Sequence, residues 1–188
     1  MKVIRTEISD VLVLEPARIG DRRGYFSETY NRRICKELGI GCDFVQDNHS
    51  LSERAGVVRG LHYQIPPMAQ DKLIRCIRGA ILDVAVDIRH GSPTFGRWVS
   101  VELTAENWRQ ALIPKGFAHG FATLEPGSEV CYKVSEYYSP EHERGIRFDD
   151  PALGIDWRID PAEATLSDRD RRHPTLAESE VHFRFGKA

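Results

Sequence analysis

The stretch VRGLHYQ at residues 58–64 carries two groups that are costly to bury, Arg59 and His62, inside an apolar, strand-like run. Alternate residues of an ideal strand share a face, so these two side chains would point to opposite sides. Gly60 stands between them, and a glycine inside a strand often marks a bulge or a close approach of two backbones. A bulge would turn both side chains toward one cavity, where an imidazole could act as a general base near neutral pH. The stretch alone favours the other interpretation, a surface arginine and a core histidine hydrogen-bonded to backbone.

Two further residues have the chemistry that a base at this place would need. Metal-free proton transfer requires a base, an acid and a group that holds the developing negative charge. Lys72 opens a strand directly after the turn PPMAQD and could stabilise an enolate oxygen. Tyr132 shares a strand face with Val130 and Val134. It is either a proton donor aimed into a barrel or a satisfied core tyrosine, and spacing alone favours the core tyrosine.

Carboxylates that could orient the imidazole lie in two places. A carboxylate commonly fixes the tautomer of a histidine base and stabilises its cationic form. The segment LSDRD at residues 166–170 offers Asp168 and Asp170. Asp83 and Asp87 alternate with apolar residues in an expected strand. They could line the same cavity, and Asp83 competes with Asp170 as the partner of the base.

A metal at this position is not expected. Residues 113–121, IPKGFAHGF, contain the spacing P-x-G-x-x-H, which resembles the second signature of the cupin superfamily, a double-sheet jelly roll. Metal-binding cupins add two histidines and a glutamate from an earlier signature. Here Gln64 stands where a second histidine would follow His62, and no glutamate lies in the turn after it. Because transition metals usually take three or four ligands, His62 and His119 alone predict a cupin-like scaffold without a metal or other cofactor.

Period-two alternation dominates the middle of the chain and predicts an all-β sandwich or barrel. In residues 80–88 the even positions from Leu82 to Ile88 form one apolar face, and the other face is more polar. Residues 30–39 predict one short helix that stops at Gly39. Turn signals rich in glycine and proline separate the strands. The other expected strands are 44–52, 58–64, 72–77, 98–103, 109–114, 119–124 and 129–138.

Length and composition fit one domain, residues 1–188, with a tail from about residue 160 that wraps the sandwich. The formal net charge of -2 gives no electrostatic reason to expect nucleic acid or an anionic membrane as the main partner. No apolar run is long enough for a signal peptide or a membrane span, and the 4 cysteines form no C-x-x-C pair. We therefore expect a cytoplasmic protein with reduced thiols.

Six blocks of sequence, taken together, resemble the dTDP-4-dehydrorhamnose 3,5-epimerase family. The resemblance covers nearly all of the chain, from the strand DVLVLEP to the segment LSDRD, and the blocks are specific only as a set. They are GDRRGYFSETYN (20–31), FVQDNHS (44–50), VRGLHYQ (58–64), QDKLIRCIRGAILDVAVDIRHGSPTFG (70–96), IPKGFAHGF (113–121) and YKVSEYYSPEHE (132–143).

The resemblance implies a metal-free jelly roll that works as a homodimer with exchanged N-terminal strands. It implies a dTDP-sugar substrate, dTDP-4-dehydro-6-deoxy-D-glucose, whose C3 and C5 centres are inverted during dTDP-L-rhamnose synthesis. By motif, His62 would remove the protons alpha to the C4 ketone, and Asp170 would pair with it. Lys72 would stabilise the enolate, and Tyr132 would return a proton from the opposite face.

The same motifs imply a set of substrate-binding residues. Arg23 and Glu28 would contact the nucleotide across the dimer. Arg59 and His119 would contact the diphosphate and the sugar, and Tyr138 would stack on the thymine. The full implied set is Arg23, Glu28, Gln46, Asp47, Asn48, Arg59, His119, Tyr138, Glu143 and Arg169.

Two positions depart from the family pattern. Arg169 stands where the family usually has lysine, and arginine keeps the charge but changes the geometry of a phosphate contact. Ile19 stands where an aromatic residue often helps to clamp the nucleotide. The second departure bears on selectivity for dTDP and leaves the proton chemistry untouched.

The remaining histidines are not expected to take part in the chemistry. His49 shares a strand face with Asp47 and is expected to be structural. The others lie in turn or tail sequence and are expected to be exposed to solvent: His90, His142, His173 and His182.

Four other functions stay open from the sequence. An epimerase that acts at C3 or C5 alone would use the same fold, but Tyr132 favours the double reaction because it supplies the opposite-face proton. A cupin ketoisomerase would shift the carbonyl instead. A catalytically silent sugar-nucleotide-binding cupin is disfavoured by the set of His62, Lys72 and Tyr132. A metal-dependent dioxygenase is disfavoured by the missing ligands.

Overall fold

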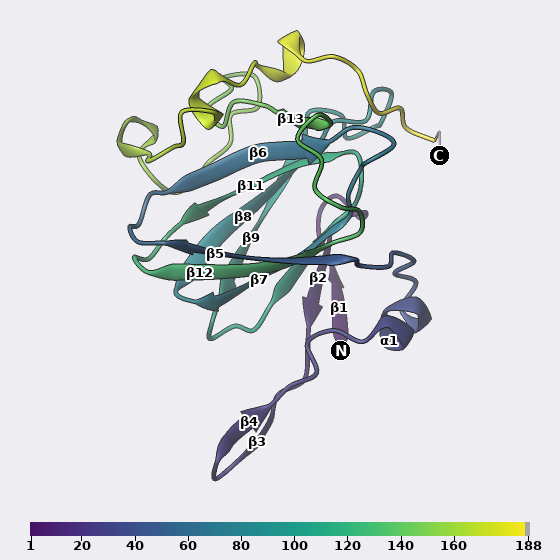
Figure 1. The fold of residues 1–188 in the computed structure, drawn as a ribbon, viewed down its shortest axis with the longest axis vertical. Helices are drawn as coiled ribbons and strands as arrows, with labels where there is room; N and C mark the ends of the chain where they lie inside the picture. The colour runs from purple at the N-terminus through teal and green to yellow at the C-terminus, as the bar shows by residue number, and fades with distance from the viewer. Residues whose placement is uncertain (187–188) are drawn as a thin grey trace.

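Two antiparallel sheets pack face to face in the structure, a computed structural model that describes residues 1–186 (Figure 1). The first sheet has the strand order β1 (Lys2–Arg5), β2 (Leu12–Glu15), β10 (Gln110–Ile113), β7 (Lys72–Arg78), β12 (Ser128–Val134) and β5 (Gln46–Ser52). The second has the order β13 (Glu143–Gly145), β6 (Val58–Gln64), β11 (Phe117–Thr123), β8 (Ala80–Asp87) and β9 (Trp98–Thr104). The predicted all-β double-sheet jelly roll is confirmed.

The elements follow the sequence pattern closely. Each strand expected from alternation is present, and the ends differ by a few residues, most at β12, which stops at Val134. The short edge strands β1 and β13 were not predicted, because three or four residues show too little alternation. The predicted helix is α1 (Arg32–Glu37), where the Asn31 side chain accepts hydrogen bonds from two backbone N–H groups of the first turn.

Strand β8 shows how alternation places residues on two buried faces. Every residue of β8 is buried, because the strand lies between β11 and β9 and both sides of the sheet are covered. Ile81 and Ala85 face the space between the two sheets, where they pack with residues of the first sheet such as Ile74 and Val130. The predicted more polar face of this strand therefore points into the interior of the sandwich and not to solvent.

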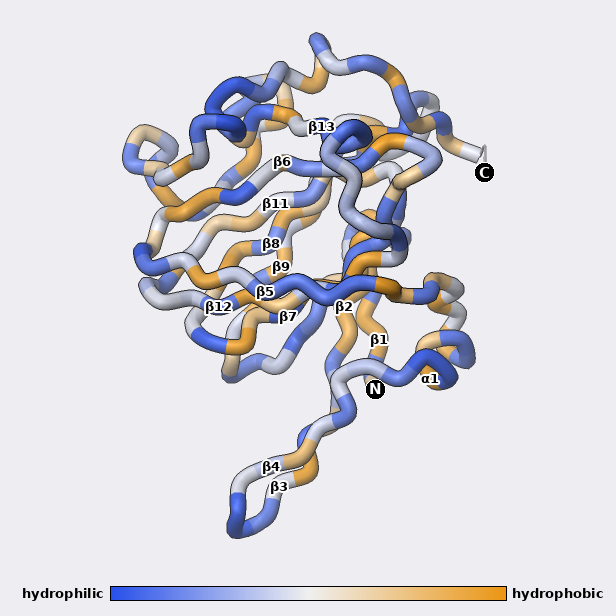
Figure 2. The backbone as a smooth tube through the Cα atoms, in the orientation of Figure 1, coloured by the Kyte–Doolittle hydropathy of each residue, from blue (hydrophilic) through white to orange (hydrophobic). Residues whose placement is uncertain are grey.

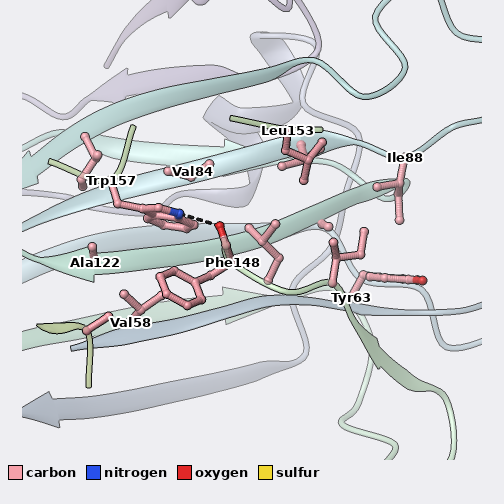
Figure 3. Packing of buried hydrophobic residues seen from close by; sticks show 14 residues of the cluster. Val58, Tyr63, Val84, Ile88, Ala122, Phe148, Leu153 and Trp157 are labelled. Carbon is pink, nitrogen blue, oxygen red and sulfur yellow. Dashed lines mark hydrogen bonds between the residues drawn. The ribbon is translucent and has the colours of Figure 1, made fainter. Parts of the chain in front are cut away.

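The C-terminal part of the chain covers the outer face of the second sheet. Leu82, Val84 and Val86 of β8 pack there against Phe148 and Trp157, as Figure 3 shows for part of the cluster. The Trp157 Nε1–H donates a hydrogen bond of 2.8 Å to the Phe148 carbonyl oxygen. Both apolar packing and this hydrogen bond therefore hold the chain around Trp157 against the sheet. Beyond it the chain runs along β6 and β13 through three single-turn helices (Figure 1): η1 (Pro161–Glu163), η2 (Asp170–Arg172) and η3 (Leu176–Glu178).

A two-stranded arm projects from the body of the molecule (Figure 1). It consists of β3 (Ile19–Asp21) and β4 (Gly24–Phe26), which pair only with each other. Three large apolar side chains of the arm, Ile19, Tyr25 and Phe26, are more than half exposed. Figure 2 shows the contrast with the body, where apolar residues follow the neighbouring strands β8 and β11. Within residues 1–186, none of the helices has the length and apolar character needed to cross a membrane.

Candidate active site

A bulge in β6 brings Arg59 and His62 into one cavity. In the pairing of β6 with β11, His62 lies opposite His119 and Arg59 lies opposite Phe121, so β6 has one extra residue between them. Gly60 provides that bulge with φ +124, and a Cβ on it would lie 2.6 Å from the Gly120 Cα. Only glycine fits such a close approach of two backbones. The structure thus has the bulge that the stretch alone had not favoured, and both side chains line a cavity of 490 Å³.

The cavity occupies the polar end of the space between the two sheets. Lys72 is followed at two-residue intervals by Ile74 and Cys76, and Tyr132 follows Val130 in the same way. Alternation therefore turns the polar side chains to the same interior side as the core residues. The polar residues that line the cavity are Ser50, Arg59, His62, Lys72, His119, Tyr132, Glu143, Thr165, Ser167, Arg169 and Asp170.

His62 is paired with Asp170, as the resemblance implies. The His62 Nε2 atom lies 2.7 Å from Asp170 Oδ1, and Asp170 is buried at the start of η2. Burial alone would raise the pKa of Asp170, but the neighbouring His173 and His62 rings outweigh it and hold the pKa well below its usual range. The carboxylate is therefore anionic at neutral pH and favours a proton on His62 Nε2. This tautomer leaves Nδ1 free to accept a proton.

Asp83, the competing candidate, contacts His119 and not His62. Its Oδ2 lies 2.8 Å from the Nε2 of His119, and both groups are buried. Burial lowers the pKa of His119, with the nearby Asp83 charge acting in the opposite direction. His119 is therefore a neutral imidazole that lines the cavity, with Asp83 behind it. Of the two carboxylates that the sequence left open, Asp170 contacts His62 and Asp83 contacts His119.

Lys72 is a buried cation at the wall of the cavity. Its Nζ donates a hydrogen bond of 3.2 Å to the His62 carbonyl oxygen. Burial lowers the pKa of Lys72 to about 8, while the charges of Asp83 and Glu143 act to raise it. The ammonium group remains protonated near neutral pH, and two of its three protons stay free for an oxygen in the cavity.

Tyr132 faces both this cavity and a neighbouring one. The neighbouring cavity, of 300 Å³, shares His62, Lys72, Tyr132 and Glu143 with the first. Burial raises the pKa of Tyr132, although the Arg59 charge lowers it. The phenol therefore keeps its proton at neutral pH and can serve as a donor. The sequence left this side chain between a core tyrosine and a proton donor, and its position on the cavity wall favours the donor.

Several predicted binding residues form a connected group at the mouth of the two cavities. The Tyr138 hydroxyl donates a hydrogen bond of 2.6 Å to Glu143, and Arg169 lies 2.6 Å from the same oxygen. Gln46 donates to Asn48 at 2.9 Å and accepts from the Tyr138 backbone N–H at 3.1 Å. Gln46, Asn48 and Tyr138 line the 300 Å³ cavity with Glu143, so these predicted residues are gathered in one place.

Three predicted binding residues do not line either cavity. Asp47 points to the outer face of the first sheet, where its side chain is 69% exposed and pairs with Lys133 at 2.7 Å. This outward direction follows from strand alternation, which turns Gln46 and Asn48 inward and the residue between them outward. Arg23 lies on the projecting arm, and Glu28 directly follows the arm. A single chain therefore does not bring these three side chains to the site.

The structure also brings to the site residues that the sequence analysis did not place there, among them Thr165, Ser167, Ser50 and His173. Ser50 lines the 490 Å³ cavity, and its buried Oγ has no hydrogen-bond partner within residues 1–186. Its position two residues after Asn48 in β5 would have indicated an inward direction. His173 was expected to be solvated, and this prediction is wrong. Its side chain is only 11% exposed because it lies against Asp170, three residues earlier in the chain.

One cluster of the described residues has the composition of a metal site. The ligand atoms of His62, Asp170 and His173 lie within 4.8 Å of one another. Two imidazoles and a carboxylate are a known ligand set for divalent metals. The hydrogen bond between His62 and Asp170 also satisfies the arrangement that a histidine base needs, so the cluster is consistent with metal-free proton transfer.

The fold and the site define a cupin-type jelly roll whose interior holds a hydrogen-bonded histidine–aspartate pair, a buried lysine and a tyrosine. The chain belongs to the dTDP-4-dehydrorhamnose 3,5-epimerase family, whose model matches residues 5–178. It is 50% identical to the dTDP-4-dehydrorhamnose 3,5-epimerase of Sinorhizobium fredii over 96% of this chain and 92% of that protein.

Solved structures agree with this assignment. The crystal structure of a dTDP-6-deoxy-D-glucose-3,5-epimerase from Legionella pneumophila, in complex with dTDP-4-keto-L-rhamnose, is 44% identical. It superposes with a TM-score of 0.94 over 99% of both chains. A 3'-monoepimerase from Streptomyces bikiniensis, in complex with dTDP-quinovose, is 38% identical with a TM-score of 0.85 over 92% of this chain and 87% of that chain. The fold thus serves relatives that invert one centre as well as relatives that invert two.

Proposed function

We propose that this protein inverts C3 and C5 of dTDP-4-dehydro-6-deoxy-D-glucose and so forms dTDP-4-dehydro-L-rhamnose for dTDP-L-rhamnose synthesis. Membership in the epimerase family and the high identity to named 3,5-epimerases support this proposal. The observation that carries it is the convergence of His62, Lys72 and Tyr132 on one cavity. A protein that only binds a sugar nucleotide has no need for a base, a cation and a proton donor at the same place.

The reaction begins with removal of a proton alpha to the ketone. C3 and C5 both adjoin the C4 carbonyl, so one catalytic set can serve both centres in turn. His62 Nδ1 takes the proton, and the electron pair of the C–H bond moves into the ring to form an enolate whose charge lies on the C4 oxygen. Asp170, 2.7 Å from the other ring nitrogen, stabilises the imidazolium that results.

Lys72 stabilises the enolate. Protons alpha to a ketone are acidic only because the negative charge moves to oxygen, so a fixed cation near that oxygen lowers the barrier. The ammonium group acts in a buried site, where electrostatic interactions are stronger than in water. Preorganised groups of this kind typically contribute about 10²- to 10³-fold in rate.

Tyr132 completes the inversion. The enolate carbon takes a proton from the Tyr132 hydroxyl on the face opposite to His62, the C4 carbonyl re-forms, and the centre is inverted. The tyrosinate then regains a proton from solvent, and the imidazolium of His62 loses one, so no net proton is gained or lost. No cofactor is needed for any step of this sequence.

Some of the proposed substrate contacts lie in the cavity, and others lie on or next to the arm. Arg59 and His119 line the cavity and are suited to the diphosphate and the sugar, and Tyr138 with Glu143 and Arg169 lies at its mouth. We propose that the protein is a homodimer in which Arg23 and Glu28 of one chain reach the nucleotide bound by the other. The exposed apolar side chains of the arm support this exchange, because apolar groups of this size are usually covered by a partner.

We also propose that the protein works in the cytoplasm. The four cysteines Cys35, Cys42, Cys76 and Cys131 are all unpaired. Free thiols are typical of proteins in reducing compartments.

Solvent isotope exchange tests the proposed reaction. The protein is incubated with dTDP-4-dehydro-6-deoxyglucose in deuterated water, and NMR then locates the isotope. We expect deuterium at both C3 and C5 and formation of the L-configured ketone, trapped if necessary by a downstream reductase. Binding without any exchange would show a silent binder or a different substrate.

A mono-epimerase is the second candidate, because the 3'-monoepimerase from Streptomyces bikiniensis shares this fold at 38% identity. The same experiment separates the two reactions. Deuterium at a single carbon, with inversion only there, would identify a mono-epimerase and restrict the role of Tyr132 to that carbon.

A further inference from the structure

His173 lies beside the base, although no step of the proposed reaction uses it. Its ring meets the ring of His62 nearly at right angles, with a centroid distance of 5.6 Å. Its Nε2 atom lies 3.4 Å from Asp170 Oδ1, the same oxygen that His62 Nε2 contacts at 2.7 Å. Two imidazole nitrogens therefore lie near one carboxylate oxygen, and the nitrogen of His62 is hydrogen-bonded to it.

The His173 ring packs tightly against the backbone of β13 at Gly145. Gly145 of β13 pairs with His62 of β6, and a Cβ on Gly145 would lie only 2.3 Å from His173 Nε2. The ring thus fills the space that any side chain at position 145 would need. The backbone after His173 is fixed as well, because the Arg147 N–H donates a hydrogen bond of 2.8 Å to the Pro174 carbonyl oxygen.

The Nε2 atom of His173 has few possible hydrogen-bond partners. This atom is shielded from solvent and has no partner of normal hydrogen-bond geometry within residues 1–186. A buried N–H without an acceptor costs about 1–3 kcal/mol. Asp170 Oδ1 lies close enough to accept after a small approach, and catalytic contacts commonly tighten when substrate binds.

We propose that His173 is a positioning residue. Its ring packs against Gly145 and donates a hydrogen bond to the carboxylate of Asp170, so that His62 and His173 share this carboxylate. The inference rests on the proposed function only for its effect on turnover. A second donor takes up part of the negative charge of Asp170. Less charge is then available to stabilise the His62 imidazolium, so the base releases its proton more readily once the product centre has formed.

Other charged or titratable groups also face His62, and each comes from a different element. Lys72 is on β7, His119 on β11, Tyr132 on β12 and Glu143 on β13, while Arg59 and Arg169 belong to β6 and to the C-terminal segment. Asp83 on β8 lies behind His119. A substitution at position 173 leaves all of them in place, so a difference between variant and wild type reports the contribution of His173 alone.

Titration of His62 by NMR tests the proposal without reference to activity. We compare the wild-type protein with His173→Phe, which keeps a ring but has no donor, and His173→Gln, which keeps an N–H donor. Removal of the donor restores the full charge of Asp170 to His62, so the His62 pKa should rise, by roughly half a unit to one unit in His173→Phe. It should rise less in His173→Gln. The acidic limb of the kcat/KM profile should move upward in pH by the same amounts.

A purely structural role for His173 would lower activity without moving either titration. An unchanged or lowered His62 pKa in a folded His173→Phe protein, with its melting temperature as the control, would overturn the proposal. If that variant does not fold, Gly145→Ala offers an independent route, because it displaces the ring while His173 itself is retained. It should shift the His62 titration in the same upward direction, and no shift there would also overturn the proposal. A protein that titrates as expected but does not epimerise would refute the proposed function and leave this inference standing.

Discussion

The cavity and the arm differ in how completely one chain can build them. The cavity is lined by strands of both sheets and by the C-terminal segment, and the proposed base, cation and proton donor all come from strands of the same chain. The arm pairs only with itself, and Arg23 on it bonds to the nearby Asp21. In the proposed homodimer, each chain would carry out the proton chemistry with its own residues, and binding of the nucleotide would need the arm of the second chain.

The most damaging change to the cavity should be loss of the base. We expect His62→Asn to lower kcat/KM by about 10³-fold or more and to abolish deuterium incorporation at both carbons, because the proposed reaction uses the His62 ring, paired with Asp170, to take the alpha proton. His49→Asn is the matched control, since His49 lies on the outer face and pairs with Glu129 at 3.0 Å. Substantial exchange in a folded His62→Asn protein would contradict the assignment.

Loss of the buried cation should be the next largest effect. Lys72→Met should lower kcat/KM by about 10²- to 10³-fold, because the enolate oxygen loses its charged partner. Lys115→Met is the control, since that lysine is exposed and lies 3.9 Å from Asp71, away from the cavity. An effect of the same size in both variants would indicate a general loss of structure.

The pH dependence of kcat/KM tests the role of the Lys72 charge directly. The pKa of Lys72 is lowered to about 8. The ammonium therefore loses its proton as pH rises through that value, and the wild-type kcat/KM should fall on the alkaline side. Lys72→Arg should be slower but should lack this alkaline limb, because guanidinium stays protonated. An identical alkaline limb in both proteins would assign the titration to another group.

Loss of the proton donor should separate exchange from inversion. Tyr132→Phe should lower the rate of inversion by about 10²-fold, while His62 still exchanges the alpha proton with solvent. The measurement is deuterium at C3 and C5 with retained configuration. Tyr137→Phe is the control, since Tyr137 is exposed and lines neither cavity. Inversion at the wild-type rate in Tyr132→Phe would remove Tyr132 from the mechanism.

The arm should affect binding more than turnover. Arg23→Ala should raise KM by about 10- to 100-fold, with kcat changed much less, because a charge-assisted contact to the nucleotide is lost. A mixed dimer of Arg23→Ala and His62→Asn subunits gives the sharper result. If the arm reaches across the dimer, one site of the mixed dimer holds both wild-type residues and regains low-KM activity. No regain would mean that Arg23 serves its own chain or no site.

Metal removal should have the smallest effect. Prolonged treatment with EDTA should leave kcat unchanged, because each step of the proposed reaction moves a proton between the substrate and a side chain or between a side chain and solvent. The cluster of His62, Asp170 and His173 makes the experiment informative. Activity that is lost on chelation and restored by one divalent metal would show that the cluster holds a metal required for turnover.

Strand alternation carried most of the correct prediction. It located the long strands, and it placed Tyr132 on the same strand face as the core residues Val130 and Val134. The sequence also offered the bulge at Gly60 as an alternative, because a glycine inside a strand often marks a bulge or a close approach of two backbones. These features depend on residues that are neighbours in the chain, and local pattern is enough to find them.

The rest depended on contacts between distant segments. Alternation could not choose between Asp83 and Asp170, because the choice depends on how a tail more than a hundred residues after His62 settles against β6. His173 was misplaced for the same reason, since a polar, arginine-rich tail looks solvated until it meets Gly145. Asp47 shows the opposite error, in which a motif was carried over as a block although alternation turns its middle residue outward.

The position of Asp170 in the chain also sets the order in which the enzyme becomes competent during synthesis. Every strand of both sheets precedes this residue, so a nascent chain can complete its sheets before the carboxylate has emerged from the ribosome. Until the last segment docks beside His62, the protein has a base without its counter-ion. A chain that ends prematurely within this segment would therefore retain much of the fold and lack the chemistry.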